Sequence, residues 1–451
     1  ALRGSTADYT TGSIPRAVLL LAIPMIIEMA GESLFAVTDA FFVARLGADA
    51  LATVGLTESM LAIVYSLAIG LCMAATAMVA RRIGAKEPRE ASHAAAQAVT
   101  LGVAIAVVLG VVGAFAAPRL LAFMGADESV VAIGSTYTRT MLGGMVTIML
   151  LFLINAAFRG AGDATIAMRS LWLANGINIV LDPCLILGLG PFPELGLTGA
   201  AVATNVGRGV GVAYQLTALF GRRGRLQPRV SDLKPDLPLL RRLLKIAWGG
   251  IGQNLIATAS WIGLVRILAL YGAAALAGYV IAIRVVVFAI LPAWGVSNAA
   301  ATLVGQNLGA GRPDRAERSV WITGFYSMLF LGSLGVGFLL GAQYVVAIFA
   351  APGEVRDIAV RCLQVVAFGY PFYAWGMVTA QGFNGAGDTR TPTWIYFFSF
   401  WLFQIPMAWV LARTLGWGPD GVFWAISVAY SLSAVIGIAL FRRGRWKTTV
   451  V

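Results

Sequence analysis

The chain has 451 residues, of which 59% are hydrophobic and only 12% are charged, and its mean hydropathy is +0.81. A soluble domain carries about a quarter charged residues, so this composition excludes an ordinary globular protein. The net charge of +12 does not indicate nucleic-acid binding, because the Lys and Arg residues lie between long apolar stretches. With one histidine, and with Cys72, Cys184 and Cys362 in separate apolar stretches, the chain has no motif for a His-based metal site or for nucleophilic catalysis.

Apolar stretches of about 20 residues, each long enough to cross a bilayer, recur along the whole chain. The polar start leads directly into the first of them, so no cleavable leader is expected. We predict an all-α polytopic membrane protein whose twelve transmembrane helices cover residues 17–44, 51–80, 92–116, 130–158, 166–189, 196–219, 243–270, 275–305, 319–341, 358–383, 392–415 and 421–441.

The Lys and Arg residues are distributed unevenly between the two sides of these spans. The N-terminal side holds most of them, whereas the loops on the other side hold only Arg45, Arg119 and Arg356. This positive-inside pattern predicts a multi-pass protein of the plasma (inner) membrane with both termini in the cytoplasm. The basic segment 222–245 is then a cytoplasmic, lipid-facing loop, so the expected partner is the lipid bilayer and not nucleic acid.

An internal repeat with an offset of 225 residues divides the chain. The sequence Gly-Ala-Gly-Asp at 160–163 recurs at 385–388, and Gly84, Ala85, Pro88 and Ala91 recur as Gly309, Ala310, Pro313 and Ala316. Gly47 and Gly196 match Gly272 and Gly421 at the same offset. The repeat predicts two six-helix pseudo-symmetric lobes, 1–225 and 226–451, which have the same orientation. We expect a substrate path between or within the lobes near the midplane.

Ionisable residues inside spans cost roughly 2.5–3.5 kcal/mol each at the bilayer centre, so each one is a functional candidate. The acidic ones all lie in the first half: Glu28, Glu32, Asp39, Glu58 and Asp182. At the repeat-equivalent positions of Asp39 and Asp182 stand Leu264 and Met407. The sequence therefore predicts that the first lobe alone, the cation-coupling lobe, handles a coupling ion.

The first span carries Glu28, Glu32 and Asp39 on one helical face, because their spacings are 4 and 7 residues. Pro24 precedes them and allows a bend. These two glutamates are either coupling groups or wet vestibule residues.

On the fifth span Asn178 and Asp182 are one turn apart, and Asn155 stands on the fourth. Such a set of oxygens suits H⁺ or Na⁺, with Asp39, Asp182 and Asn178 as the Na⁺ ligands. The alternatives are interhelical hydrogen bonds for the two asparagines and structural pairing with an arginine for the two aspartates.

A further hypothesis concerns a gate. Glu58 maps by the repeat to Ile283, next to Arg284. A Glu58–Arg284 contact between the lobes is one reading, and a partner for each residue inside its own lobe is the other.

These residues resemble the multidrug and toxic compound extrusion (MATE) transporters, in particular their DinF-like branch. The resemblance covers essentially the whole chain and rests on Pro24, on Val37-Thr38-Asp39, on the segment from Asn178 to Pro183 and on the Gly-Ala-Gly-Asp loops. It implies a drug/H⁺ or drug/Na⁺ antiporter with Asp39 and Asp182 as coupling carboxylates. Asn155 and Asn178 would be their polar partners, and Pro24 the hinge of the first helix.

The chain departs from the family pattern at two places. NorM-like members carry acidic residues in the seventh and tenth spans, where this chain has none. A hydroxyl that some members supply from the sixth span has Thr204 as its nearest match, with Ala200 as an equally good alignment.

An acidic first lobe and 10% aromatic residues favour small lipophilic organic cations or drugs as substrates, through charge attraction and cation–π contact. We expect a secondary active exporter that acts as a monomer without a cofactor other than the coupling ion. The alternatives are a lipid-linked saccharide flippase of the same superfamily and a channel. No enzyme activity is expected.

Overall fold

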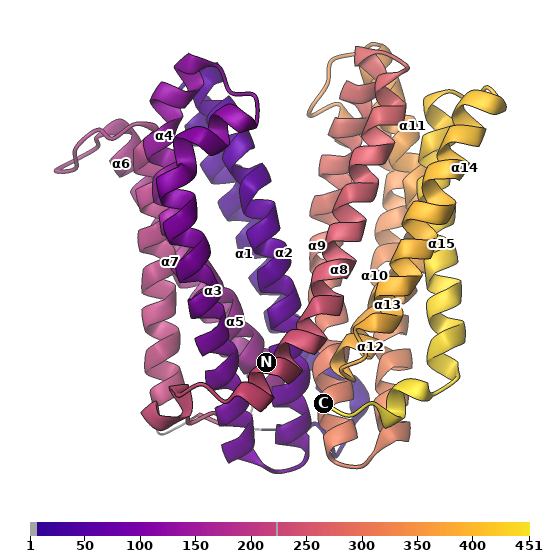
Figure 1. Ribbon diagram of the computed structural model, residues 1–451. Coiled ribbons are helices and arrows are strands. Elements are labelled where there is room, and N and C mark those ends of the chain that lie inside the picture. Colours follow the sequence, from indigo (N-terminus) through magenta and orange to yellow (C-terminus); the bar gives the residue numbers. More distant parts are fainter. Residues whose placement is uncertain (1–6, 222–223) are drawn as a thin grey trace. The chain divides into compact units, whose positions relative to one another are not determined.

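The protein is described by a computed structural model that covers residues 7–221 and 224–451. These residues form helices joined by short turns and contain no strand. Figure 1 shows that the long helices within each part of the molecule run alongside one another. The all-α fold expected from the hydropathy pattern is thus confirmed.

The helices of the first half form six spans, of which the fourth is broken into two helices. They are α1 (Ile14–Ala44), α2 (Ala48–Gly84), α3 (Pro88–Phe123), α4 with α5 (Glu128–Gly143 and Met145–Ala161), α6 (Ala164–Leu187) and α7 (Leu197–Phe220).

The second half repeats this order after the short 3₁₀ turn η1 (Val230–Leu233). Its six spans are α8 (Leu237–Ala269), α9 (Ala273–Gly309), α10 (Pro313–Val346), α11 with α12 (Glu354–Phe368 and Tyr370–Gly385), the run α13, η2, α14 and η3 (Arg390–Tyr396, Phe397–Gln404, Ile405–Trp409 and Val410–Thr414), and α15 (Pro419–Arg442). A last 3₁₀ turn, η4 (Arg445–Thr448), follows. The elements η2 and η3 are π-helical, which the sequence did not predict.

Ten of these twelve spans in the described residues are apolar and long enough by themselves to cross a membrane. The two others, α7 and the pair α11–α12, are more polar. Helix α7 carries Asn205, Arg208 and Gln215, and α11 begins with several charged residues. Polar spans that pack inside a bundle are compatible with a membrane when their polar groups face protein.

The chain folds into two compact units. One contains residues 27–247, and the other contains residues 8–26 together with residues 248–451. The first turns of α1 therefore pack in the second unit, where Met25 and Ile26 lie against Gly295 of α9. The first turns of α8 belong to the first unit. The domain boundary predicted at residue 225 describes the sequence repeat and stays a prediction.

Equivalent turns have equivalent backbones in the two halves. Gly162 and Gly387, which both end a Gly-rich turn, have a φ of 86°. Lys86, whose φ is 62°, is the only described non-glycine residue with a positive φ, and its repeat partner is Gly311 with a φ of 68°. The break between α4 and α5 at Gly144 recurs between α11 and α12 at Gly369. The glycine-rich loops are thus tight turns. Such turns require a residue in the left-handed conformation, which glycine adopts without steric cost.

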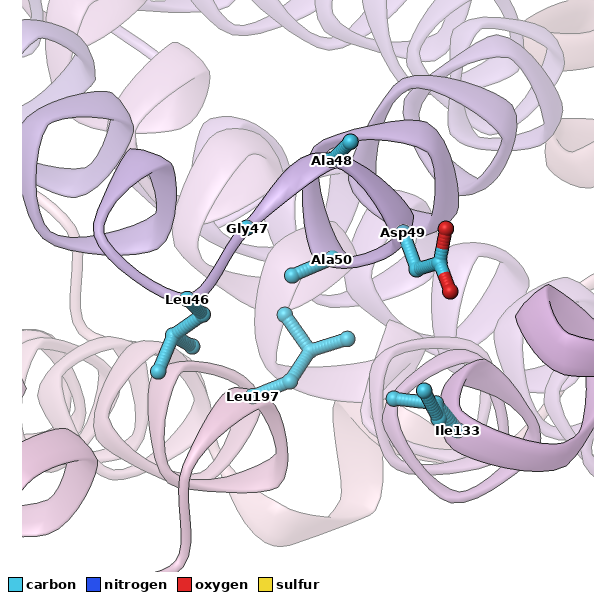
Figure 2. A pocket seen from close by; sticks show the side chains of 7 residues that line it. All are labelled: Leu46, Gly47, Ala48, Asp49, Ala50, Ile133 and Leu197. Atoms are coloured by element: carbon cyan, nitrogen blue, oxygen red, sulfur yellow. The ribbon is translucent and has the colours of Figure 1, made fainter.

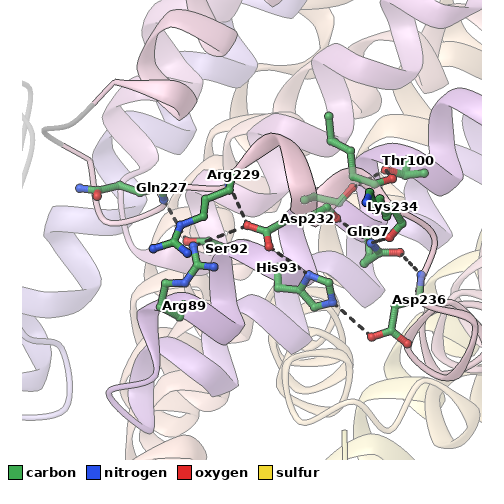
Figure 3. Close-up of polar contacts among 12 residues, drawn as sticks. Arg89, Ser92, His93, Gln97, Thr100, Gln227, Arg229, Asp232, Lys234 and Asp236 are labelled. Atoms are coloured by element: carbon green, nitrogen blue, oxygen red, sulfur yellow. Dashed lines mark hydrogen bonds and ion pairs between the residues drawn. The ribbon is translucent and has the colours of Figure 1, made fainter.

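The segment between the two halves is bound to α3, as Figure 3 shows. Gln97 donates through Nε2 to the carbonyls of Asp232 and Lys234 at 2.6 Å each, and its Oε1 accepts from the amide of Asp236 at 2.9 Å. His93, the only histidine, lies 3.2 Å from an Asp236 carboxylate oxygen and 3.6 Å from one of Asp232. We call residues 227–236 the linker clasp.

The C-terminal segment is bound in the same way to α10, the counterpart of α3. Lys447 lies 2.6 Å from Glu317 and 3.2 Å from Asp314. Trp446 is buried and stacks on Phe441 with ring centroids 4.4 Å apart. We call residues 445–449 the tail clasp. Each half therefore ends in a segment that returns to its own third span.

Candidate ion-coupling site

The core of the candidate site is a hydrogen-bonded group between α6 and α7. Asn178 donates through Nδ2 to Thr204 Oγ1 at 3.1 Å and to Asp182 Oδ1 at 3.4 Å. Asp182 is fully buried, and Asn178 and Thr204 are buried as well. Asn178 and Asp182 meet because they are one turn apart on α6, and Thr204 reaches them because α6 packs along α7 for most of its length.

Two acceptor atoms of this group have no partner. Asp182 Oδ2 and Asn178 Oδ1 are buried and receive no hydrogen bond. Oxygens of this kind are what a proton donor or a hard cation such as Na⁺ would bind. The sequence-predicted residues therefore fit a coupling ion. The described residues contain no cluster of three or more His, Cys, Asp or Glu side chains that could hold a metal ion.

Asp39 lies on α1 within electrostatic range of Asp182. It also interacts electrostatically with Glu58 of α2 and with Arg208 of α7. The structure thus places both expected coupling carboxylates in one unit and near each other, on two different helices.

Asn155 belongs to a second, separate group. Its Oδ1 accepts from Ser170 Oγ at 2.9 Å and from Gln215 Nε2 at 2.6 Å. Its Nδ2 lies 3.5 Å from Glu28 Oε1, which also accepts from Arg159 Nη1 at 2.7 Å. The structure therefore separates Asn155 from the group around Asp182, with which the sequence had joined it.

Glu28 is buried and paired inside the first unit, and its role as a coupling or vestibule residue stays a prediction. Only 2% of it is exposed, and it forms a buried ion pair with Arg159 on α5. Arg159 lies inside the unit because α5 continues to Ala161. Glu32 is half-buried.

Arg208 is a basic residue inside the sixth span to which the sequence assigned no role. It donates from Nη2 to the Tyr65 hydroxyl at 3.1 Å, and its guanidinium lies 6.0 Å from the Phe35 ring centroid. It interacts electrostatically with Glu32, Asp39 and Glu58. Its position inside a span requires a counter-charge, but the sequence does not show which of the distant carboxylates supplies it.

The remaining expected residues lie as follows. Pro24 is inside α1, two residues before Ile26, at which the chain passes from one compact unit to the other. Glu58 has Arg208 as an electrostatic partner in its own unit. Arg284 is exposed on α9 of the second unit. The contact between Glu58 and Arg284 stays a prediction.

A hollow of about 460 Å³ lies elsewhere in the first unit, at the start of α2. Figure 2 shows it lined mainly by apolar side chains, among them Leu46, Ile133 and Leu197, with the Asp49 carboxylate as its single charge. None of the expected site residues lines it. We therefore place the functional site at the buried polar groups and not in this hollow.

The profile of the MatE family matches the chain twice, at residues 24–184 and 251–410. The chain belongs to the MATE transporter family. The two matches contain equivalent parts of the two halves, as expected for a protein built from a repeat. The protein is therefore a membrane transporter and not an enzyme.

Relatives and solved structures agree with this assignment. The chain is 27% identical over 441 residues to a probable multidrug resistance protein NorM from Thermotoga maritima, with 97% of this chain and 94% of the relative covered. It is 25% identical over 428 residues to an FAD transporter from Shewanella oneidensis, with 95% and 94% covered. Among solved structures, an outward-facing multidrug resistance MATE family transporter of the MOP superfamily matches with a TM-score of 0.92 and 25% identity over 99% of both chains.

These matches confirm the fold of twelve transmembrane helices in two six-helix lobes that the apolar stretches and the internal repeat had predicted. The assignment to the DinF-like branch stays a prediction.

Proposed function

We propose that this MATE transporter is a secondary active exporter that exchanges H⁺ or Na⁺ for lipophilic organic cations across the inner membrane. The observation that carries the proposal is the buried group of Asn178, Asp182 and Thr204, whose unpartnered oxygens lie near a second carboxylate, Asp39. The multidrug resistance proteins among its relatives support the substrate class.

The proposed exchange follows from electrostatics. Two carboxylates that lie close together in a low-dielectric interior hold one positive charge, either a proton or Na⁺, more easily than none. A cationic substrate that approaches Asp39 competes with that charge. Exchange then requires only that site occupancy changes the balance between two arrangements of the lobes, for which Pro24 is the proposed hinge.

Orientation is part of the proposal. The excess of Lys and Arg on one side places both termini, the linker clasp and the tail clasp in the cytoplasm. The protein is proposed to act as a monomer, since each chain carries a complete site in its first unit.

The test is uptake of a fluorescent lipophilic cation into proteoliposomes under an imposed pH gradient or an imposed Na⁺ gradient. We expect gradient-driven uptake with at least one of the two ions. Uptake that responds to neither gradient would refute the proposed exchange.

The gate hypothesis has its own test. Glu58→Arg and Arg284→Glu should each reduce uptake, and the double variant should restore it if the two side chains pair during the transport cycle. If all three variants fold and the double variant is as inactive as the single ones, the pairing is wrong, and Arg208 remains the relevant partner of Glu58.

A further inference from the structure

A polar seam runs between α1 and α6 in the first unit. Helix α1 contributes Glu28, Glu32 and Asp39, and α6 contributes Asn175, Asn178 and Asp182. The spacings of 4 and 7 residues on α1, and of 3 and 4 on α6, place each set on one helical face.

The two faces are held close together at the level of Trp172. Its Nε1 donates to the Ile27 carbonyl at 2.8 Å. Gly31 lies so near that a Cβ on it would come within 3.1 Å of the same nitrogen. Next to this contact, Asn175 lies beside Glu32. Further along, Asp39 and Asp182 lie within electrostatic range of each other.

Buried polar atoms without partners gather along this seam and directly beside it. Among the described residues of the first unit these include Glu28 Oε2, Asn178 Oδ1, Asp182 Oδ2, Arg208 Nη1 and Gln215 Oε1. Glu28, Asn178, Asp182 and Gln215 are each no more than 2% exposed. Buried polar atoms that no protein group satisfies are ordinarily satisfied by water, and a polar site with several such atoms is where water enters a protein interior.

The charged and titratable groups around the seam form a continuous series. Glu28 contacts Arg159 of α5 and interacts electrostatically with Cys72 of α2 and with Glu32. Glu32 interacts with Arg208 of α7, which binds the Tyr65 hydroxyl of α2 and also interacts with Asp39. Arg159 lies two residues before the end of α5, so this end of the series lies toward the cytoplasm in the proposed orientation.

We propose that the seam is a hydrated proton path, in which Glu32 and Glu28 carry protons between the Asp39–Asp182 pair and the cytoplasmic side. The inference rests on the proposed function, because it requires a proton as the coupling ion. In each step an O–H bond of a carboxylic acid breaks and the proton passes through water to the next carboxylate, where a new O–H bond forms. After the last step the proton leaves to cytoplasmic water, and each carboxylate is again in its starting form.

The repeat-equivalent positions in the second unit carry neutral residues, and this difference supports a proton-carrying role for Glu28. Gln253 and Asn384 are the repeat equivalents of Glu28 and Arg159, and they form a neutral hydrogen bond of 3.0 Å between α8 and α12. The fold therefore requires only a polar contact between these helices. The carboxylate in the first unit is an addition that packing alone does not explain.

The experiment measures two rates in proteoliposomes that contain a pH-sensitive dye. The first is proton-coupled uptake of a fluorescent lipophilic cation under a pH gradient. The second is counterflow, the exchange of labelled for unlabelled cation without a gradient, which needs substrate binding and lobe movement but no net proton transfer. In Glu28→Gln and in Glu32→Gln we expect proton-coupled uptake to fall by at least about tenfold, while counterflow stays within about twofold of wild type.

A second variant removes the folding ambiguity. Glu28→Gln removes the carboxylate that pairs with Arg159. The double variant Glu28→Gln with Arg159→Asn introduces the neutral pair that the second unit already accommodates. It should fold stably and show the same loss of proton-coupled uptake. Gln253→Ala is the matched control, because it removes a buried hydrogen bond at the equivalent position and should leave the ratio of the two rates unchanged.

Other outcomes are decisive in the opposite direction. Equal loss of both rates in the double variant would make Glu28 purely structural, and unchanged proton-coupled uptake would remove it from the path. A wild-type protein driven by Na⁺ but not by a pH gradient would overturn the proton path and leave the exporter intact. A wild-type protein driven by neither ion would refute the proposed function itself.

Discussion

The first span of each half is tied to its own unit in the same way, but with different chemistry. In the first unit Trp172 donates to the Ile27 carbonyl at 2.8 Å, and Arg159 pairs with Glu28 one residue further along. In the second unit Trp401 donates to the Ile256 carbonyl at 3.0 Å, and the pair formed by Gln253 and Asn384 is neutral.

The contrast continues into the middle of the spans. The positions equivalent to Asp39 and Asp182 are Leu264, which is fully buried, and Met407, and both belong to an extended apolar core. The repeat thus preserved the helix contacts and the turns in both units, while ionisable groups are found at these positions only in the first. We therefore expect positions shared by the two repeats to serve folding and positions that differ in charge to serve transport.

The largest effect should come from the coupling carboxylates. We expect Asp39→Asn to abolish gradient-driven uptake and Asp182→Asn to reduce it by at least about tenfold, because an amide cannot exchange a proton or balance the charge of an ion. Leu264→Ala and Met407→Ala, at the equivalent positions, should leave the dependence of uptake on the gradient unchanged. Uptake by proteoliposomes measures all four variants.

If Asp39→Asn takes up the cation at the wild-type rate under a pH gradient and also under a Na⁺ gradient, the prediction that only the first unit couples transport to an ion is wrong. Size-exclusion chromatography of each variant provides the control for folding, since Asn and Asp differ little in size.

A smaller effect should appear in stability, because loss of the Glu28–Arg159 ion pair and loss of the Gln253–Asn384 hydrogen bond should cost different free energies of unfolding. Arg159→Ala leaves the buried Glu28 carboxylate without its counter-charge, and removal of one partner from such a pair costs about 3–5 kcal/mol. Asn384→Ala leaves only an unpaired amide at Gln253, which costs about 1–3 kcal/mol. We therefore expect a larger loss of thermal stability in detergent for Arg159→Ala, as measured by tryptophan fluorescence.

Equal losses in these two variants would mean that the Glu28–Arg159 pair is not desolvated, and that the two units differ less than the structure indicates.

The smallest effect concerns the two clasps, which should respond to opposite ends of the pH scale. A hydrogen bond with His93 lowers the pKa of Asp236 in the linker clasp. Its contribution to stability is present above the ordinary value of about 3.9 and is lost as the pH falls through the lowered value. A hydrogen bond to Glu317 raises the pKa of Lys447 in the tail clasp. That contribution is complete below the ordinary value of about 10.4 and is lost as the pH rises through the raised value.

Hydrogen–deuterium exchange of residues 227–236 and 445–449, corrected for intrinsic rates, measures both clasps. Acid should loosen the first and alkali the second, and His93→Ala should affect only the first. If both segments loosen together, the clasps are not independent.

The sequence predicted the spans well because hydropathy, glycine turns and the repeat are local or periodic signals. It predicted that Asn178 and Asp182 lie one turn apart on one helix face, and the structure brings Thr204, the nearest match to the family's hydroxyl, to the same place. The role of these residues in coupling stays a prediction. The sequence did not pair Glu28 with Arg159, because the two residues are 131 positions apart and Arg159 lies where the apolar stretch ends. The π-helical turns of η2 and η3 also escaped prediction, because their composition is as apolar as that of an ordinary span.

The first turns of α1 pack in the second unit. This arrangement has a consequence for the order in which the protein folds during synthesis. The backbone carbonyls of Tyr9 and Thr10 accept hydrogen bonds from Asn307 and Arg312, and these partners are synthesised about 300 residues later. Residues 9 and 10 must therefore wait until residues 307 and 312 have been made before they reach their final positions. Likewise the start of α8 returns to a unit that is already in the bilayer. Biogenesis of the two halves is thus interlocked, and neither half completes its own packing from its own residues alone.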